Sequence, residues 1–106
     1  MDDDAVFRAL ADPSRRCLLD RLHARNGQTL GDLCQGLAMT RQAVAKHLAL
    51  LEQASLVVSE RRGREKRHFI NPVPINAISE RWIMKFDRLR LDAPSSPKRD
   101  LEGDRE

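Results

Sequence analysis

The spacing of apolar residues changes at Ser55 from a helical period to the alternation of a strand. Before this point, residues 41–54 carry apolar side chains at intervals of four and three, which is one face of a helix. After it, residues 56–61 and 66–70 favour two strands, joined by a turn that contains Gly63. The sequence therefore predicts helices followed by a single β-hairpin, with a further helix after it.

Capping residues place the helix starts. Asp12 can accept hydrogen bonds from the free N–H groups of a first turn, and Pro13 fits the first helical position because its missing donor costs nothing there. Thr29, with Asp32 three residues on, approaches a capping box, and Thr40 is the next candidate cap. The expected helices span about 4–11, 13–25, 30–36, 41–54 and, after a proline-containing break at 71–74, 74–91. Their expected apolar faces contain Cys17, Leu18, Leu19 and Leu22, then Leu30, Leu33, Cys34 and Leu37, then Val44, Leu48 and Leu51 with Leu50 beside them.

Length and composition exclude several classes of protein. The chain has 106 residues, 41 % hydrophobic and 33 % charged, which suits one small globular domain, expected over 1–91. Residues 92–106 are rich in Pro, Ser and charge, so we expect a disordered tail. No apolar run approaches the roughly 18 residues of a membrane span, and the acidic start lacks the basic end of a signal peptide. Two cysteines are too few for a disulfide framework. We therefore expect a cytoplasmic protein without membrane association.

The charges are distributed unevenly along the chain. Residues 1–4 and 92–106 together hold three of the 19 basic and eight of the 16 acidic residues, which leaves 16 basic against eight acidic over 5–91. A basic body with acidic ends favours a polyanionic partner, most simply double-stranded DNA. The alternative is a solvated surface that is rich in arginine.

The order of the elements matches a known geometry. A short helix, a tight turn and a second helix with a polar leading face is the arrangement that enters the major groove of DNA. The Arg-rich hairpin over 56–70, the wing, can contact flanking phosphates or the minor groove. The predicted fold class is mainly α with a small β-hairpin (α+β), a winged helix-turn-helix, and we expect it to be dimeric.

Three motifs in order resemble the ArsR/SmtB-type winged-helix repressors. They are F-R-A-L-A-D-P-S-R-R at 7–16, T-R-Q-A-V-A-K-H-L at 40–48, and L-E-Q-A-S-L-V at 51–57. The resemblance covers about residues 5–91. It implies a prokaryotic, homodimeric, DNA-binding transcriptional regulator, usually a repressor that a signal releases. Ser55 stands where the family has glycine, so a left-handed backbone there would impose a modest strain.

Polar and basic residues of the second helix and the wing are the candidate DNA contacts. Arginine and glutamine can bind guanine and adenine edges bidentately, and a small alanine can meet a thymine methyl group. Cations in the wing can neutralise phosphates, which would make binding steeply dependent on salt. The alternatives are a solvated face, and for His47 packing at the edge of the motif; Arg15 and Arg16 are weaker candidates for phosphate contacts. The candidate contacts are Thr40, Arg41, Gln42, Ala43, Lys46, His47, Arg61, Arg62, Arg64 and Lys66.

The last expected helix is the candidate dimer surface. Trp82 and Phe86 are two of only four aromatic residues, and they fall on one seam with spacings of three and four. The family resemblance implies that the first and last helices pack across a two-fold axis. The alternative is that the seam belongs to the core of one chain. The candidate interface residues are Phe7, Leu10, Ile75, Ile78, Trp82, Ile83, Phe86 and Leu89.

Motifs for a metal, a cofactor or catalysis are lacking. Metal-sensing relatives have several cysteines where this chain has only Cys34, and the last expected helix contains no histidine. There is no glycine-rich phosphate loop or nucleophile elbow, so we predict no enzyme, no cofactor and no metal site. Two other hypotheses stay open: a winged-helix module that binds protein through Trp82, and a thiol-responsive sensor that uses Cys34. The sequence also leaves open whether an inducer exists.

Overall fold

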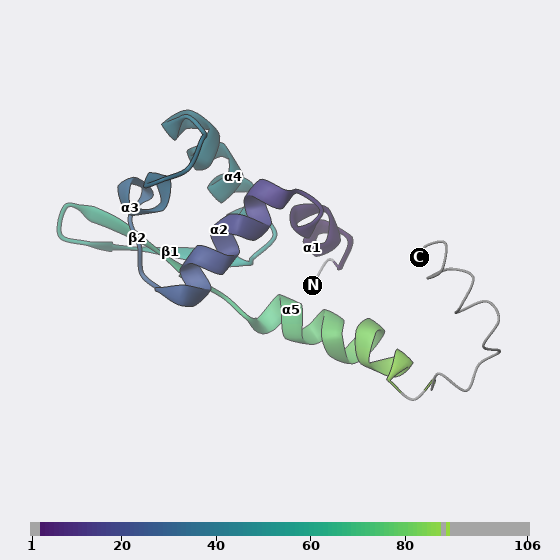
Figure 1. The fold of residues 1–106 in the computed structure, drawn as a ribbon. Coiled ribbons are helices and arrows are strands. Elements are labelled where there is room, and N and C mark those ends of the chain that lie inside the picture. Colours follow the sequence, from purple (N-terminus) through teal and green to yellow (C-terminus); the bar gives the residue numbers. More distant parts are fainter. Residues whose placement is uncertain (1–2, 88, 90–106) are drawn as a thin grey trace. The chain divides into compact units, whose positions relative to one another are not determined.

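The computed structural model describes residues 3–87 and 89 and falls into two compact units, Met1–Asn76 and Ala77–Glu106, each of which is described by itself (Figure 1). The helices and strands expected in the first unit are all found, with bounds within two residues of the prediction. The elements of this unit are α1 (Asp3–Leu10), α2 (Pro13–Ala24), α3 (Leu30–Cys34), α4 (Arg41–Gln53), β1 (Val57–Arg62) and β2 (Glu65–Ile70), after which α5 (Val73–Ile78) spans the division.

The core of the first unit lies between α2, α3 and α4. Leu18, Leu22, Leu33, Val44 and Leu51 are fully buried, as their helical spacing predicts. The prediction that Leu50 joins this face is wrong, because Leu50 is 36 % exposed. Leu50 lies two positions after buried Leu48, and a step of two positions turns the helix by about 200°, which directs Leu50 away from the face of Leu48. Cys17, Leu30, Cys34 and Leu37 are half-buried.

Two arginines join α1 to α2. Asp12 caps α2 as predicted, because its Oδ1 accepts from the N–H groups of Ser14 (2.7 Å) and Arg15 (3.3 Å). The last carbonyls of α1 have no donor within their own helix. Arg15 Nε donates to the carbonyl of Ala9 (2.8 Å), and Arg16 Nη1 donates to that of Leu10 (2.8 Å). The structure therefore directs these two guanidinium groups to the end of α1.

Side-chain caps also define the helix-turn-helix formed by α3 and α4. Thr29 Oγ1 accepts from the N–H of Asp32, and the Asp32 carboxylate accepts from that of Thr29, both at 3.1 Å, which completes the capping box. Thr40 Oγ1 accepts from the N–H of Ala43 at 3.0 Å. Gly36 supplies a positive φ (75°) in the connection between the helices.

Both aspartate caps are expected to weaken in acid. Burial opposes ionisation of Asp12, but the N–H groups of Ser14 and Arg15 outweigh it and hold the pKa of Asp12 below its ordinary value. Hydrogen bonds from the backbone and hydroxyl of Thr29 likewise lower the pKa of Asp32. A lowered pKa in the folded state means that each stabilising contribution is full above about pH 4 and is lost as the pH falls through the folded value.

The urea concentration at the unfolding midpoint should therefore decrease as the pH is lowered below about 4. Between about pH 7 and 5, these two groups should leave that midpoint unchanged. Urea titrations across this range measure the effect. The Asp32→Asn variant keeps an acceptor oxygen but has no charge to lose, so its midpoint should fall less. An equally steep fall in that variant would contradict the assignment for Asp32.

Ser55 ends α4 in the left-handed conformation, with φ of 64°. Its N–H donates to the carbonyl of Glu52, and the N–H of Leu56 donates to that of Leu51, both at 2.9 Å. These are the two hydrogen bonds of a Schellman motif, in which glycine is the usual residue. The strain expected from serine at this position is therefore present.

Replacing Ser55 with glycine should stabilise the protein. The left-handed conformation costs a non-glycine residue roughly 1–2 kcal/mol, and the greater freedom of unfolded glycine offsets part of the gain. We expect a net gain of about 1 kcal/mol, seen as a rise in Tm of roughly 4–8 °C. The control is Ser55→Ala, which keeps the strain and should not raise Tm. A glycine variant no more stable than the alanine variant would contradict this account.

The wing is a tight hairpin. β1 and β2 pair antiparallel from Val57 with Ile70 to Arg62 with Glu65, so the turn is shorter than the predicted 62–65. Gly63 provides the positive φ (64°) that such a turn needs. An isolated bridge between Gln28 and His68 joins the loop before α3 to the free edge of β2. The base of the wing is thus attached to the helices.

The prediction of one α-helix over 74–91 is wrong over 79–86. Ser79–Ile83 is π-helical, with the N–H of Met84 donating to the carbonyl of Ser79, and Met84–Phe86 is a short 3₁₀ helix. Side chains over 80–87 are all exposed, so no packed face holds this stretch to α-helical geometry. The rest of the expected helix, apart from residues 87 and 89, and the expected tail lie outside the described residues.

Candidate nucleic-acid interface

The first turns of α4 present their polar side chains to solvent. Burial of Val44 and Leu48 fixes the rotation of the helix about its axis. As a consequence, the predicted contacts of this helix lie on or beside its outer face. Thr40, Arg41, Gln42 and Lys46 are exposed, and Ala43 and His47 are half-buried.

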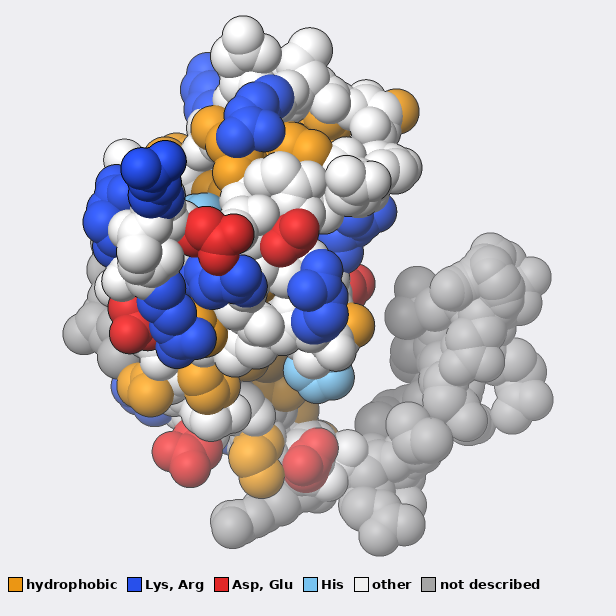
Figure 2. Space-filling view, turned by 90° about the vertical axis from the view of Figure 1, so that its left-hand side faces the viewer, with side chains coloured by type: hydrophobic (Ala, Val, Ile, Leu, Met, Phe, Trp, Pro, Cys, Tyr) orange, Lys and Arg blue, Asp and Glu red, His pale blue; other side chains and the backbone are white. Residues whose placement is uncertain are grey.

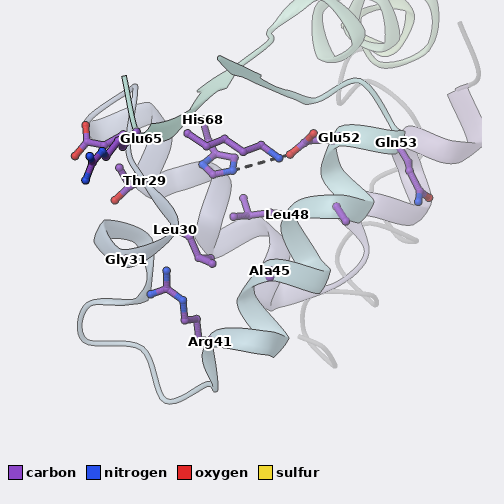
Figure 3. Close-up of a pocket in the computed structure, with 13 residues that line it drawn as sticks. Thr29, Leu30, Gly31, Arg41, Ala45, Leu48, Glu52, Gln53, Glu65 and His68 are labelled. Carbon is purple, nitrogen blue, oxygen red and sulfur yellow. Dashed lines mark ion pairs between the residues drawn. The ribbon is translucent and has the colours of Figure 1, made fainter. Parts of the chain in front are cut away.

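A groove of about 790 Å³ lies between α3, α4 and the wing (Figure 3). Leu30, Leu48 and Ala45 contribute apolar surface to its lining. The guanidinium group of Arg41 extends from the start of α4 towards Gly31, where its Nη1 is 3.8 Å from the position that a Cβ would occupy. Wing residues Arg64 and Lys66 also line the groove.

Ala45 and Ala49, which were not among the predicted contacts, also line this groove. Both are exposed although they belong to a helix with a well-packed core face. Their signal was available in the sequence, since small residues four apart on the polar side of a helix allow close approach of another molecule.

The two faces of the wing have different charges. Side chains alternate along a strand, and directly paired residues of antiparallel strands share a face. Arg61 pairs with Lys66, so both share the face of buried His68, which lines the groove. Arg62 pairs with Glu65 and belongs to the opposite face, although Glu65, next to the turn, also lines the groove.

Local contacts hold Arg62 on that opposite face. Its Nη2 is 3.3 Å from Glu60 Oε1, and its guanidinium lies 5.0 Å from the centroid of the Phe69 ring. The structure therefore places Arg64 and Lys66 in the lining of the groove beside α4. Arg61 shares the strand face of Lys66, and Arg62 belongs to the other face. The four cations form one cluster in the sequence, and only the alternation of side chains along a strand separates Arg62 from the others.

Buried polar residues tie the wing base to the helices. His68 Nδ1 donates to the carbonyl oxygen of Gln28 (3.0 Å), and His68 Nε2 is 4.0 Å from Glu52 Oε2 (Figure 3). The side-chain amide of Gln28 donates to the carbonyls of Arg21 (2.8 Å) and Arg25 (2.6 Å) at the end of α2. Both His68 and Gln28 are 5 % exposed. These contacts fix the point from which the wing extends.

The side chain of His47, on α4, contacts Arg15 of α2. Its Nδ1 is 3.3 Å from Nη1 of Arg15, so the ring nitrogen accepts from the guanidinium. This is the packing at the edge of the motif that the sequence offered as the alternative role of His47.

Figure 2 views the molecule from the side that carries the wing tip in Figure 1. Lys and Arg side chains cover much of this face, with carboxylates among them, and a hydrophobic patch lies near the top. A surface of this kind can attract a polyanion through its cations while its apolar part contacts bases or sugars.

The second unit carries an exposed apolar surface. Trp82, Ile83, Met84 and Phe86 are each about half exposed, and the rings of Trp82 and Phe86 meet edge to face at 5.2 Å. Lys85 Nζ lies over both rings, 5.3 and 5.4 Å from their centroids. The other predicted interface residues differ in exposure: Phe7 is 40 % and Leu89 69 % exposed, Leu10 and Ile75 are half-buried, and Ile78 is buried.

Cys17 and Cys34 are free thiols and half-buried. Among the described residues, no three His, Cys, Asp or Glu side chains lie close enough together to share a metal ion. In the same part of the chain, no helix has the length and apolar character needed to cross a bilayer.

The helix-turn-helix, the hairpin behind it and the exposed polar start of α4 define a winged helix-turn-helix protein. A family model described as a helix-turn-helix domain matches residues 10–60. The chain is 43 % identical to the HTH-type transcriptional regulator YuzN of Bacillus subtilis over 86 residues, 76 % of this chain and 94 % of the relative. It is 30 % identical to the transcriptional repressor SdpR of the same organism over 81 residues, 76 % of this chain and 88 % of that one.

A solved structure supports the same assignment. The ArsR-like transcriptional regulator from Rhodococcus sp. RHA1 superposes with a TM-score of 0.69 at 36 % identity, over 82 % of this chain and 84 % of that one. The chain belongs to the ArsR family of transcriptional regulators. These are DNA-binding proteins rather than enzymes.

Proposed function

We propose that the protein is a homodimeric transcriptional repressor that acts in the cytoplasm and binds a palindromic operator. The start of α4 enters the major groove, where Arg41 and Gln42 contact base edges and Lys46 contacts a phosphate. Arg61, Arg64 and Lys66 of the wing contact the flanking backbone. The observation that carries the proposal is that Arg41, at the exposed start of α4, lines the same groove as Arg64 and Lys66 of the wing.

Two copies fit this function better than one. A two-fold dimer presents two copies of α4 to two half-sites, and their separation follows the turn of the DNA helix. Trp82, Ile83 and Phe86 of the second unit are exposed and apolar, and so is Phe7 of the first unit. These are side chains that a second copy would cover.

Fluorescence anisotropy tests the proposal with DNA from upstream of the protein's own gene, a scrambled duplex and a series of salt concentrations. If that DNA fails to bind, an operator is selected from a random pool. We expect binding to be selective. The logarithm of the association constant should fall linearly with the logarithm of the salt concentration, with a slope of about 0.9 for each phosphate neutralised. Failure to select any sequence would overturn the proposal and favour binding of another protein through the apolar surface.

A further inference from the structure

Arg67 reaches from the wing to the helices. Its Nη1 donates to the carbonyl of Gly27 at 2.7 Å, a residue 40 positions earlier in the loop between α2 and α3. Its Nε and Nη2 donate to Glu65 Oε1 at 3.1 and 2.6 Å. Two edges of one guanidinium are therefore occupied, and the Arg67 side chain is only 31 % exposed. A planar guanidinium can hold both acceptors at once, which a lysine ammonium does less well.

The Gly27 end of this contact is itself held firmly. The N–H groups of Gly27 and Gln28 donate to the carbonyl of His68 at 2.9 and 3.2 Å, and the N–H of His68 donates to the carbonyl of Gln28 at 2.8 Å. The Phe69 ring packs against Gly27 so closely that a Cβ there would come within 3.0 Å of it. Gly27 is thus a fixed anchor at the base of the wing.

Arg67 is the outermost hydrogen-bonded link between wing and helices. Among the described residues, the hydrogen bonds of 61–66, which include the wing tip, run only within the hairpin itself. The direction of the tip therefore depends on the contacts nearest to it. Arg67 also lies on the face opposite Lys66, since neighbouring strand residues point to opposite sides.

We propose that Glu65, Arg67 and the Gly27 carbonyl form a wing clamp that positions Arg61, Arg64 and Lys66 on DNA, and that Glu65 and Arg67 are positioning residues rather than phosphate contacts. This inference rests on the proposed function. It has an unusual consequence: a carboxylate in the DNA-binding wing favours binding of a polyanion, because it orients the arginine that holds the wing. If charge alone mattered, removal of Glu65 would strengthen DNA binding.

Four variants of the full chain separate these explanations. Glu65→Ala and Arg67→Lys break the clamp, and the second keeps the charge. Glu60→Ala is the matched control, because Glu60 is also an exposed acid on the same wing face and lies opposite Arg67 on β1, but its ion pair is with Arg62. Lys66→Gln removes a proposed phosphate contact next to the clamp. Each is measured by anisotropy on the operator across salt concentrations, with urea denaturation to establish that it is folded.

The clamp predicts that Glu65→Ala and Arg67→Lys each weaken operator binding about fivefold and leave the salt slope unchanged. Glu60→Ala should bind slightly more tightly than the unmodified protein. Lys66→Gln should reduce the salt slope by about 0.9. On operators shortened at the flanks, the clamp variants and the unmodified protein should bind alike, because the clamp acts only through wing contacts. A general loss of stability would not depend on flank length.

Several binding results would overturn the clamp. They include tighter or unchanged binding by Glu65→Ala, full affinity in Arg67→Lys, and equal losses on long and short operators. Amide hydrogen exchange without DNA gives an independent test: residues 61–66 should exchange faster in Glu65→Ala than in Glu60→Ala, and equal rates would contradict the clamp. If the unmodified protein shows no salt-dependent binding and Lys66→Gln has no effect, the proposed function itself is wrong. If Lys66→Gln reduces the salt slope as expected but Glu65→Ala does not change operator affinity, the clamp is wrong and the proposed function stands.

Discussion

Replacing Trp82 and Phe86 together by alanine should convert the proposed dimer to a monomer and weaken operator binding at least a hundredfold. Both rings are about half exposed and contact each other edge to face, so they present one aromatic surface to a partner. Truncating a central aromatic residue typically costs about 2 kcal/mol or more of association free energy. Two such losses amount to roughly a thousandfold in the dimerisation constant.

Operator binding should weaken when dimerisation is lost, because a monomer engages only one half-site. The first unit should stay folded, since its buried core comes from α1 to α4 and the wing base rather than from these rings. Analytical ultracentrifugation measures the mass, and anisotropy measures the affinity. Val73→Ala is the control, because Val73 is apolar and 53 % exposed but lies outside the aromatic surface. A double variant that remains dimeric would refute the assignment of this surface.

The Gln42→Ala variant should lose about thirtyfold or more in affinity for the operator and almost nothing for random DNA. Gln42 is exposed in the first turn of α4, and its amide can donate to and accept from an adenine edge. A good bidentate contact contributes about 1–3 kcal/mol of discrimination, and a two-fold dimer makes it twice. Arg41→Ala should behave similarly if its guanidinium turns from Gly31 to a guanine.

Gln35 provides a matched control for this measurement. It is also an exposed glutamine of the helix-turn-helix, at the end of α3, but it is not among the residues that line the groove. Gln35→Ala should leave both affinities unchanged. Equal losses on operator and random DNA in Gln42→Ala would make that residue a backbone contact and move sequence reading elsewhere on the surface.

Much of the first unit could be predicted from the sequence because its signals are local. Asp12, Thr29 and Thr40 cap helices through hydrogen bonds to residues two or three positions away. The glycine-like position of Ser55 follows from the end of α4 and the motif around it. The candidate DNA contacts on α4 followed from the same logic, since one buried face defines the opposite exposed one.

Other features depend on partners far away in the chain. The sequence places Arg62 and Lys66 in one basic cluster, but the pairing of β1 with β2 puts them on opposite faces. No residue near Arg67 in the sequence indicates that its guanidinium donates to the carbonyl of Gly27. The spacing of Ile78, Trp82 and Phe86 predicts one α-helix, yet the stretch after Ile78 adopts π and 3₁₀ geometry.

The sequence by itself determined where the helices of the first unit begin, which side of α4 is buried, and the family to which the chain is similar. Hydrogen bonds and rotations between near neighbours decide these features. Only the tertiary structure decided which wing cations share the groove with α4 and how the wing is attached. Those depend on strand pairing and on contacts such as Arg67 with Gly27, 40 residues apart, which local propensity does not specify.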